Sequence, residues 1–303
     1  MTSEWHEVPL RELVGYISKG IAPSYAEEAS ETTIRVLNQK CNRNFRISYG
    51  DSRLHDTLKK KVPPERYVKP DDILINSTGA GTAGRIAQIE DVPSATTIDG
   101  HMTLIRSNGK VTQKFLGYAL KAHQWEVLQL DEGSTGQTEL NRDRLLDEIM
   151  INYPVSFDEQ NAIVGTLESI DRKLIVNEQL NDNLEQQAQA IYHERFETVS
   201  PNDLPSDWRI VTLGEVATIS NKSFNPLKEP EILLEHYSIP AFDEARFPVF
   251  ELSASIKSNK FIIDASCFMI SKLNPTTKRV WKPYCLTGNA VCSTEFIVYK
   301  ANV

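Results

Sequence analysis

Three glycines in the spacing G-x-G-x-x-G, Gly79, Gly81 and Gly84, are the residues of this sequence most suggestive of chemistry. They follow the apolar run ILI at 73–75, which is typical of a buried strand. A dinucleotide loop needs a long helix after its last glycine, because amides at the helix N-terminus hold the pyrophosphate. Here the next stretch, RIAQIEDVP, alternates apolar and polar residues and ends at Pro93, which is a strand pattern. We therefore favour a strand–loop–strand tip, and keep a nucleotide-cofactor enzyme using Gly79–Gly84 as the alternative.

Motifs for other reactions are absent from the sequence. It holds no nucleophile elbow, no P-loop and no H-E-x-x-H zinc motif. The stretches NPLK at 225–228 and NPTT at 274–277 lack the aromatic residue with which an adenine-methylating motif stacks a flipped base. His101 is on an apolar stretch that reads as a strand, where a histidine is more often structural than a ligand. The sequence therefore predicts a protein without an active site of its own.

Cysteine and histidine usage argues against metal and disulfide chemistry. The four cysteines form no C-x-x-C pair, and the six histidines complete no metal-ligand spacing. The N-terminus lacks the apolar core of a signal peptide, and no apolar run approaches the ~18 residues of a membrane span. We expect a cytoplasmic protein with no metal, no cofactor of its own and no membrane partner.

The net charge of −8 is distributed unevenly over the 303 residues. Residues 35–69 carry 10 Lys or Arg against 3 Asp or Glu, net +7, and residues 257–282 carry 6 against 1, net +5. Residues 156–206 carry 3 against 10, net −7. Basic islands neutralise phosphates in nucleic-acid-binding proteins. The distribution predicts two basic DNA-binding surfaces on either side of an acidic segment.

An internal repeat relates these two surfaces. EWHEVPLRELVGYIS at 4–18 resembles DWRIVTLGEVATIS at 207–220, with Trp5 matching Trp208 at an offset of 203. YVKPDDILINSTGAGTAGRI at 67–86 aligns with FIIDASCFMISKLNPTTKRV at 261–280, with Arg85 matching Arg279 at an offset of 194. The second copy loses all three glycines, which favours a variable loop over a cofactor site. Residues 110–197 have no second counterpart, so we expect a chain that stops inside its second copy.

The hydrophobic pattern predicts an α+β fold for the first copy. A short strand at 6–10 precedes a short helix at 11–17, and a helix at 112–130 is followed by a polar turn at 131–143 and a second helix at 142–149. A strand at 150–155 closes the domain. The remaining strands are expected at 33–38, 45–49, 72–76, 85–90 and 96–106.

Residues 158–197 differ from both copies because they predict one long helix. Ser156 is a suitable N-cap, no proline interrupts the segment, and at 1.5 Å per residue it would span about 60 Å. Apolar residues recur with heptad spacing, with two asparagines at core positions, as in coiled coils whose register is fixed. The helix could instead pack on its own domain. The positions expected to face a partner helix are Ile163, Leu167, Ile170, Leu174, Asn177, Asn181, Leu184 and Ile191.

Two similar domains separated by a rod are typical of a bipartite DNA reader. A rod of about 60 Å corresponds to roughly 18 base pairs, which is an upper limit for the separation of the half-sites. Cations would neutralise phosphates and loops would read bases. A coiled-coil scaffold without a DNA role is the remaining alternative. The residues expected to contact DNA are Lys40, Arg43, Arg46, Arg53, Lys59, Lys60, Lys61, Ser77, Thr78 and Arg85, with Lys272, Lys278 and Arg279 from the second copy.

The run GSTGQTELNRDRLLDEIMINYPVSFDEQNAIVGTLESIDRKLIVNEQLNDNLEQQAQAIYHERF at 133–196 closely resembles the first conserved region of specificity (S) subunits of Type I restriction–modification systems. LPSDWRIVTLGEVATI at 204–219 and VKPDDILINSTGAGTAGRIAQI at 68–89 are also similar to that family. The resemblance covers the whole chain, and it is most specific over 133–196.

The resemblance implies a concrete organisation. Such subunits carry two inverted target recognition domains, joined by two antiparallel helices of fixed length, and each domain reads half of a split double-stranded DNA target. They bind two modification (methyltransferase) subunits, which use S-adenosylmethionine to methylate adenine, while restriction subunits add ATP-driven translocation and cleavage. The specificity subunit is not an enzyme. On this basis we expect a recognition domain at 1–155, a spacer helix at 156–199, a linker at 200–206 and an incomplete recognition domain at 207–303. Because the second helix is missing, the spacer helix could pair with that of another copy.

Overall fold

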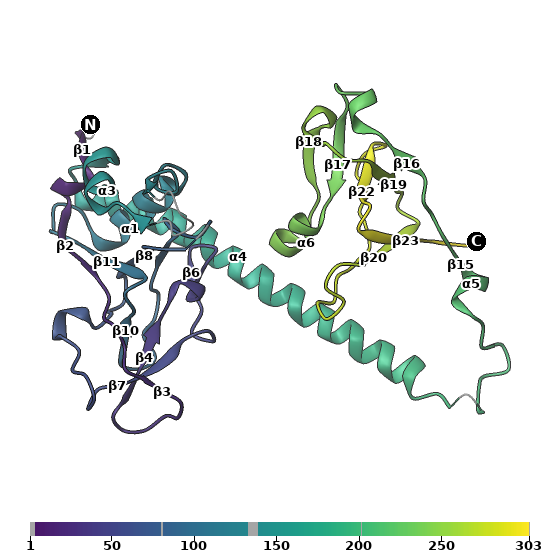
Figure 1. Cartoon of the computed structure of the whole chain (residues 1–303), viewed down its shortest axis with the longest axis horizontal. Helices are drawn as coiled ribbons and strands as arrows, with labels where there is room; N and C mark the ends of the chain where they lie inside the picture. The colour runs from purple at the N-terminus through teal and green to yellow at the C-terminus, as the bar shows by residue number, and fades with distance from the viewer. Residues whose placement is uncertain (1–3, 80, 133–138, 201, 303) are drawn as a thin grey trace. The chain divides into compact units, whose positions relative to one another are not determined.

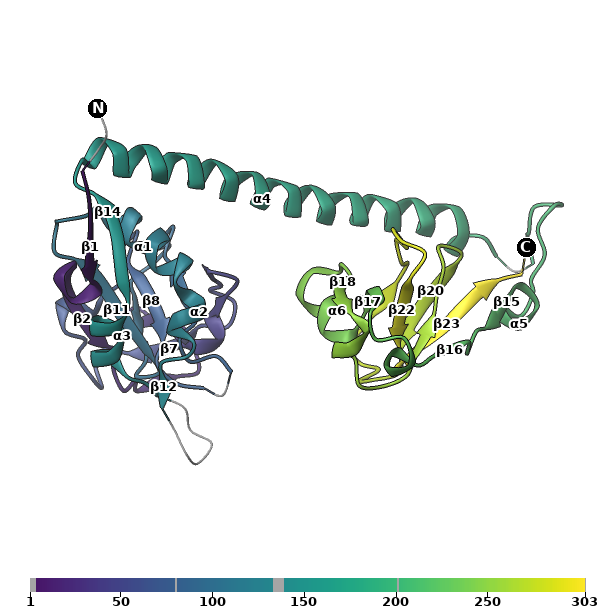
Figure 2. The same ribbon diagram turned by 90° about the horizontal axis from the view of Figure 1, so that it is seen from above.

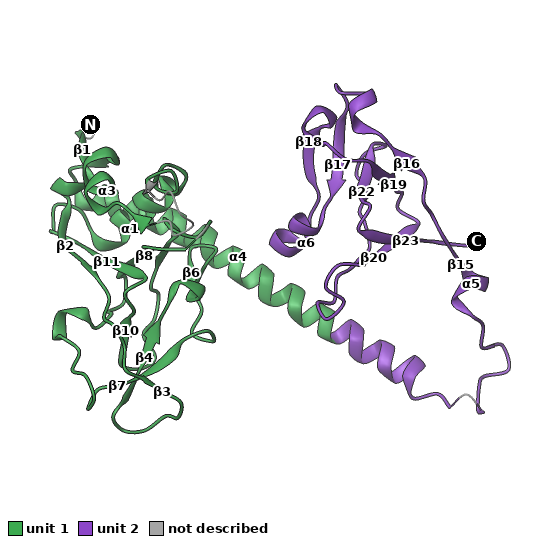
Figure 3. Ribbon diagram, in the orientation of Figure 1, with its two compact units in different colours: residues 1–186 green, residues 187–303 purple. Residues whose placement is uncertain are grey.

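The computed structural model describes residues 4–79, 81–132, 139–200 and 202–302, and divides into two compact units, residues 1–186 and 187–303 (Figure 3). Residues 133–138 of the expected turn at 131–143 and residue 201 of the expected linker lie outside the described residues. Each unit is a mixed α/β structure, and the division falls within one long helix. The mixed fold and the long helix predicted from the sequence are confirmed.

Unit 1 is built around an antiparallel sheet of four strands in the order β2-β11-β8-β9. Figure 1 labels the first three of them. Its strands are β2 (Val14–Lys19), β11 (Met102–Ser107), β8 (Ile73–Asn76) and β9 (Ile86–Gln88). All four residues of β8 are buried, because both faces of the sheet are covered. Ile73 and Ile75 join the apolar cluster formed with the helices, whereas Leu74 joins the cluster on the opposite face. The continuous apolar run at 73–75 is therefore a central strand.

A second sheet of unit 1 has the order β10-β4-β7-β3. Strand β10 (Thr96–Ile98) pairs in parallel with β4 (Thr33–Leu37), and β4 pairs antiparallel with β7 (Arg53–Asp56), which in turn pairs with β3 (Tyr25–Ala26). Leu37 and Ile98 of this sheet pack with Leu74 and Leu104 of the first sheet. The unit therefore has a layer of helices, a central sheet and an outer sheet.

The helix layer of unit 1 consists of α1 (Gln113–Ala122), α2 (Gln124–Val127) and α3 (Arg142–Glu148). Thr112 caps α1 by accepting a hydrogen bond from the Phe115 amide. Strand β1 (Trp5–Pro9) pairs antiparallel with β14 (Met150–Pro154), so the beginning of the unit lies next to the segment that leads into the long helix. Two-residue pairs, β5 (Asn42–Arg43) with β6 (Arg46–Ile47) and β12 (Asp131–Glu132) with β13 (Glu139–Leu140), complete the unit.

Four sequence-based element predictions for unit 1 were wrong in detail. Residues 11–17 were expected to form a helix, but only 3₁₀ turn η1 (Leu10–Glu12) forms, and residues 14–17 belong to β2, which pairs with β11. The strand expected at 96–106 is two strands separated by a turn, and the helix expected at 112–130 is broken at His123. The strand expected at 45–49 is reduced to β6. For residues 11–17, pairing with β11 outweighs the local pattern.

Helix α4 (Phe157–Tyr192) is a single element of 36 residues, about 54 Å long at 1.5 Å per residue, and Figure 2 shows it without interruption. Ser156 caps it, because its hydroxyl accepts a hydrogen bond from the Glu159 amide at 3.4 Å. Its buried residues are Gln160 and Val164, near the start. A short π-helical turn, η4 (His193–Glu197), continues it. No helix of the described residues is both long and apolar enough to cross a bilayer.

Unit 2 also contains two sheets. One has the order β15-β23-β20-β21, formed by β15 (Ala217–Ile219), β23 (Phe296–Ala301), β20 (Cys267–Ser271) and β21 (Val280–Trp281). The other has the order β16-β19-β22-β17-β18, formed by β16 (Ser223–Phe224), β19 (Lys260–Ile262), β22 (Ala290–Ser293), β17 (Leu233–Tyr237) and β18 (Val249–Leu252). Helices α5 (Leu213–Val216) and α6 (Ile239–Ala245) accompany them. Trp281 lies at the centre of the core, with its ring 4.7 Å from that of Tyr237 and 5.3 Å from that of Phe242.

The two units share one strand order in their antiparallel four-stranded sheets. Equivalent strands begin 194 residues apart in four pairs, β8 and β20, β9 and β21, β10 and β22, and β11 and β23. Strands β2 and β15 begin 203 residues apart. In the second sheets, β4 pairs in parallel with β10 as β17 does with β22. These offsets are the ones that relate the repeated sequences.

Candidate nucleic-acid interface

The glycine-rich stretch forms the tip of an antiparallel hairpin. Strands β8 and β9 pair with Leu74 opposite Ala87 and Ile75 opposite Ile86, so no helix follows the last glycine. Gly79, Gly81 and Gly84 all have positive φ, which glycine adopts without strain. At Gly84 a side chain would also collide with the backbone at the end of α2, since its Cβ would lie 2.9 Å from the Val127 carbonyl oxygen. The prediction of a strand–loop–strand tip is confirmed.

The hairpin tip contacts the turn that follows β4, named η2 (Gln39–Cys41). The Thr78 hydroxyl donates to Gln39 Oε1 at 3.3 Å, and Thr78 Oγ1 lies 2.7 Å from His101 Nδ1. Gly79 lies against the same amide, because a Cβ there would be 2.9 Å from Gln39 Oε1. We call Gln39, Thr78, Gly79 and His101 the tip cluster. It gathers polar groups from three separate segments at one end of the central sheet.

Two buried asparagines support the tip cluster through hydrogen bonds to its backbone and to each other. Asn76 Nδ2 donates to the Gln39 carbonyl at 3.1 Å, and Asn42 Nδ2 lies 3.2 Å from Asn76 Oδ1 and 2.8 Å from the Arg85 carbonyl. Both asparagines are almost completely buried. Buried amides that satisfy backbone groups are costly to replace, so this support fixes the geometry of the surface above it.

Residues predicted to contact DNA surround the tip cluster. Ser77 is fully buried and its hydroxyl lies 2.7 Å from that of Thr103, so it supports the hairpin from inside. Thr78 and Arg85 are partly exposed, and Lys40 and Arg43 are exposed. The side chains of Lys40, Arg43 and Arg85 make no ion pair with any described residue, which leaves their charges available to an anionic ligand.

Lysines 59–61 lie at the opposite end of β7 from Arg53 and the tip cluster. Arg53 begins this strand opposite Val36, and its guanidinium lies 3.3 Å from the centre of the Tyr25 ring. After the end of β7, the Lys60 ammonium donates to the Ala22 carbonyl at 2.9 Å, and Lys59 lies 3.9 Å from Asp56. Lys61 is exposed. The basic island at 35–69 is therefore divided between two ends of one sheet.

Two of the predicted arginines already hold a carboxylate. Arg46 donates to Glu178 of α4 at 2.5 Å, and Arg279 forms two hydrogen bonds to Asp243 of α6, at 2.7 and 2.8 Å. The Asp243 pKa is lowered by this arginine. These guanidiniums orient protein segments, and each would have to exchange its carboxylate for a DNA group in order to bind DNA.

The hairpin tip of unit 2 connects β20 to β21, as the glycine-rich tip connects β8 to β9. It carries Lys272 and Lys278, both exposed, together with Arg279. Gln39 lies in the segment after β4, and Asp243 lies in the segment after β17, the strand of unit 2 that corresponds to β4. In each unit, therefore, the hairpin tip contacts the segment that follows this strand.

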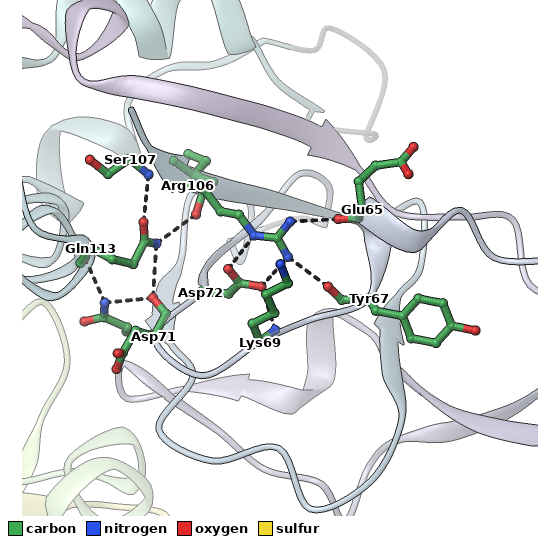
Figure 4. A network of polar contacts seen from close by, with 10 residues as sticks. Glu65, Tyr67, Lys69, Asp71, Asp72, Arg106, Ser107 and Gln113 are labelled. Carbon is green, nitrogen blue, oxygen red and sulfur yellow. Dashed lines mark hydrogen bonds and ion pairs between the residues drawn. The ribbon is translucent and has the colours of Figure 1, made fainter. Parts of the chain in front are cut away.

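A polar network within unit 1 joins β11 to the segment that precedes β8, the strand that leads to the tip (Figure 4). Arg106 of β11 donates to both oxygens of Asp72 at 2.7 Å, and to the carbonyls of Glu65 and Tyr67 at 2.9 and 2.8 Å. The pKa of Arg106 is raised, chiefly by its hydrogen bonds to Asp72. In unit 2 the position of Arg106 is held by Lys300, which pairs with Asp264 at 2.6 Å. Its acidic partner lies two residues before Ser266, the position that corresponds to Asp72.

Two members of the tip cluster were not among the residues predicted from the sequence to contact DNA. Gln39 carries no charge, and its role depends on contacts with residues far along the chain. His101 was interpreted as a half-buried residue on a strand, but it is exposed, precedes β11 and meets Thr78. Its place in the turn between two apolar segments, 96–98 and 102–107, was the only available signal.

The spacer-helix positions divide into two groups. Ile163 and Leu167 are partly buried against unit 1. Further along α4 the remaining predicted positions are exposed, and among them Ile170, Leu174, Leu184 and Ile191 each keep about half of their surface exposed. Asn177 and Asn181 are exposed with them. Pairing with a second helix stays a prediction.

Three solved structures are similar to this chain. The S subunit of a Type I restriction–modification system from M. genitalium matches with a TM-score of 0.53 at 15% identity, over 100% of this chain and 74% of that chain. The HsdS subunit from Thermoanaerobacter tengcongensis matches with a TM-score of 0.43 at 16% identity, over 98% and 75%. A chain from a study of complex assembly and conformational transition of the type I R-M system matches with 0.47 at 16%, over 99% and 76%. The first likeness shows a shared fold.

No curated protein matches this sequence. A family model for the Type I restriction modification DNA specificity domain matches residues 2–186, more than half of the 303 residues. This match confirms the resemblance drawn from residues 133–196. Nothing in the hairpin geometry or in these comparisons supports a nucleotide-cofactor site at Gly79–Gly84. The chain therefore belongs to the family of Type I restriction modification DNA specificity domains.

Proposed function

We propose that this chain is the non-catalytic specificity subunit of a Type I restriction–modification complex, and that its two units each read one half of a bipartite DNA target. The observation that carries the proposal is the strand order that recurs in the two units, with a hairpin tip at the same place in each. Two related surfaces on one chain suit a target made of two half-sites.

Each unit would bind DNA with its tip and the cations around it. In unit 1, Lys40 and Arg43 lie beside the tip cluster and would neutralise phosphates, while the tip reads base edges. In unit 2, Lys272 and Lys278 are exposed on the corresponding hairpin. Lysines 59–61 would add a further phosphate contact at the other end of β7.

Helix α4 would serve as the spacer. Its exposed apolar residues, including Leu174, Leu184 and Ile191, suit packing against another helix, either of a modification subunit or of a second copy. In this proposal the modification and restriction subunits carry S-adenosylmethionine and ATP, and the specificity subunit binds neither.

The function is tested by expressing the chain with its cognate modification subunits and mapping methylated adenines in the host DNA. We expect one bipartite motif, with two fixed half-sites separated by a spacer of constant length. Methylation at a single contiguous motif, or methylation that does not depend on this chain, would contradict the proposal.

A pair of variants tests the assignment of one half-site to each unit. In hydroxyl-radical footprints of the assembled complex, Lys278→Ala in unit 2 should weaken protection of the DNA backbone in one half-site only, whereas Lys40→Ala in unit 1 should weaken it only in the other. Both side chains are exposed, so neither change should affect folding. Effects of both variants on the same half-site would refute the assignment.

A further inference from the structure

The tip cluster holds one side chain in an arrangement that suits a base edge. Gln39 is partly exposed, lies beside the exposed Lys40, and is not part of the hydrophobic core. Its backbone is fixed twice: the Asn76 amide donates to its carbonyl at 3.1 Å, and Asn38 caps the turn by accepting from the Lys40 amide at 2.9 Å. The side chain therefore projects from a rigid turn.

A chain of hydrogen bonds also orients the Gln39 amide. The Thr78 hydroxyl has one proton and donates it to Gln39 Oε1 at 3.3 Å. Thr78 Oγ1 must then accept from His101 Nδ1, which lies 2.7 Å away. Donation runs from His101 through Thr78 to Gln39, so the oxygen of the amide faces the hairpin. Gln39 Nε2 makes no hydrogen bond to any residue that the structure describes.

Gly79 makes room for this arrangement. A Cβ at position 79 would lie 2.9 Å from Gln39 Oε1 and 2.3 Å from Thr82 Oγ1, which is closer than such atoms approach. The backbone also has a φ of +114° there, which side chains rarely allow. Of the three glycines at the tip, Gly79 is therefore the one that seats the Gln39 amide.

We infer that Gln39 reads an adenine in the half-site bound by unit 1, with Thr78 and His101 as positioning residues. A glutamine amide pairs with the major-groove edge of adenine, because its oxygen accepts from N6 and its nitrogen donates to N7. Gln39 Oε1 retains one lone pair after accepting from Thr78, and Nε2 has both protons to donate. The adjacent Lys40 supplies a cation for a flanking phosphate. This inference rests on the proposed function.

The test uses the full chain assembled with its modification subunits and a pool of randomised duplexes, from which bound sequences are selected and read. Gln39→Ala should abolish the preference for adenine at one position of one half-site, lowering discrimination there by roughly 5- to 150-fold. Other positions should keep their preferences. Gln129→Ala, which changes an exposed glutamine after α2, is the matched control.

Two further variants separate reading from structural support. Thr78→Val removes the hydroxyl that orients the amide and should relax discrimination at the same position, whereas Thr78→Ser keeps the hydroxyl and should retain it. An unchanged motif for Gln39→Ala would overturn the inference, as would an equal loss of binding to every sequence. If the wild-type assembly selects no motif at all, the proposed function fails, rather than the assignment of Gln39.

Discussion

The Lys121 ammonium lies 2.9 Å from an Asp171 carboxylate oxygen, and this contact joins α1 to the spacer helix α4. The Tyr118 hydroxyl donates to the same oxygen at 2.9 Å, and Lys114 pairs with Glu168 one turn earlier on α4. Burial of Asp171 opposes its ionisation, but these donors outweigh burial and lower its pKa. Together the five side chains form a clamp that holds the first half of α4 against α1.

The first prediction concerns this clamp. Asp171→Asn should weaken the attachment of the helix by about 1 kcal/mol, because it removes a partly exposed ion pair and perturbs a hydrogen bond. Hydrogen exchange over residues 164–175 should accelerate accordingly. Asp182→Asn, on the exposed part of the same helix, is the control and should leave exchange unchanged. Equal protection in the wild type and Asp171→Asn would contradict a stabilising role for the clamp.

The second prediction concerns the buried pair of Arg106 and Asp72. Arg106→Leu leaves the Asp72 carboxylate, whose side chain is 3% exposed, without its partner, and should cost about 3 kcal/mol of the free energy of unfolding of unit 1. Arg11→Leu breaks a pair with Asp147 in which both side chains are about half exposed, and should cost much less. Urea unfolding of both variants measures the difference, and similar losses would rule out burial as the cause.

The third prediction concerns Glu235, a buried carboxylate of unit 2. Burial opposes its charge, but Tyr237, the Leu286 and Thr287 amides and the Thr287 hydroxyl all donate to it and lower its pKa. A carboxyl whose folded pKa lies below its unfolded value of about 4.3 adds stability that is fully present above that value. This stability is lost as the pH falls through the folded pKa.

The expected result is that unit 2 unfolds in acid with a contribution from Glu235. Glu235→Gln should lower stability at neutral pH by about 1–3 kcal/mol and flatten the dependence on acid pH. The fluorescence of Trp281 reports the transition, because it is the one buried tryptophan of the described residues and its ring contacts Tyr237. Glu231→Gln, at an exposed position, is the control. An identical acid profile for Glu235→Gln and the wild type would refute this role.

The fourth prediction decides which end of the outer sheet of unit 1 faces DNA. Replacing Lys40 and Arg43 with alanine should weaken binding about equally for all sequences and reduce the slope of log K against log salt by about 2. The triple change Lys59→Ala, Lys60→Ala and Lys61→Ala should flatten the slope less than its three charges suggest, because Lys60 is bound to Ala22 and Lys59 lies near Asp56. A larger effect of the triple change would place the DNA at the opposite end of β7.

Features with strong local signals could be predicted from the sequence. The apolar run at 73–75, the alternation after Gly84 and the uninterrupted pattern of 158–197 correspond to β8, β9 and α4. The repeat offsets of 194 and 203 reappear as the spacing of equivalent strands. The prediction of a helix at residues 11–17 was wrong, because their apolar spacing is compatible with a helix but pairing with β11 makes most of them a strand.

The candidate site was less accessible to sequence reasoning than the fold. Charge identified Lys40 and Arg43, but it could not show that Arg46 and Arg279 are held by carboxylates of distant elements. The partnership of Gln39 with Thr78 joins residues separated by 39 positions and depends on how η2 meets the hairpin. No local pattern encodes a contact of that kind.

The glycines of the tip differ in what they would permit in directed evolution of new DNA targets. A side chain at Gly84 would collide with the Val127 carbonyl, whereas a Cβ at Gly81 would meet no atom within 4 Å and only its φ of +68° favours glycine. Asparagine tolerates such a conformation. A library should therefore hold position 84 constant and diversify position 81, where asparagine is the natural first replacement. Within one hairpin, position 84 is therefore restricted to glycine by packing, whereas position 81 is open to substitution.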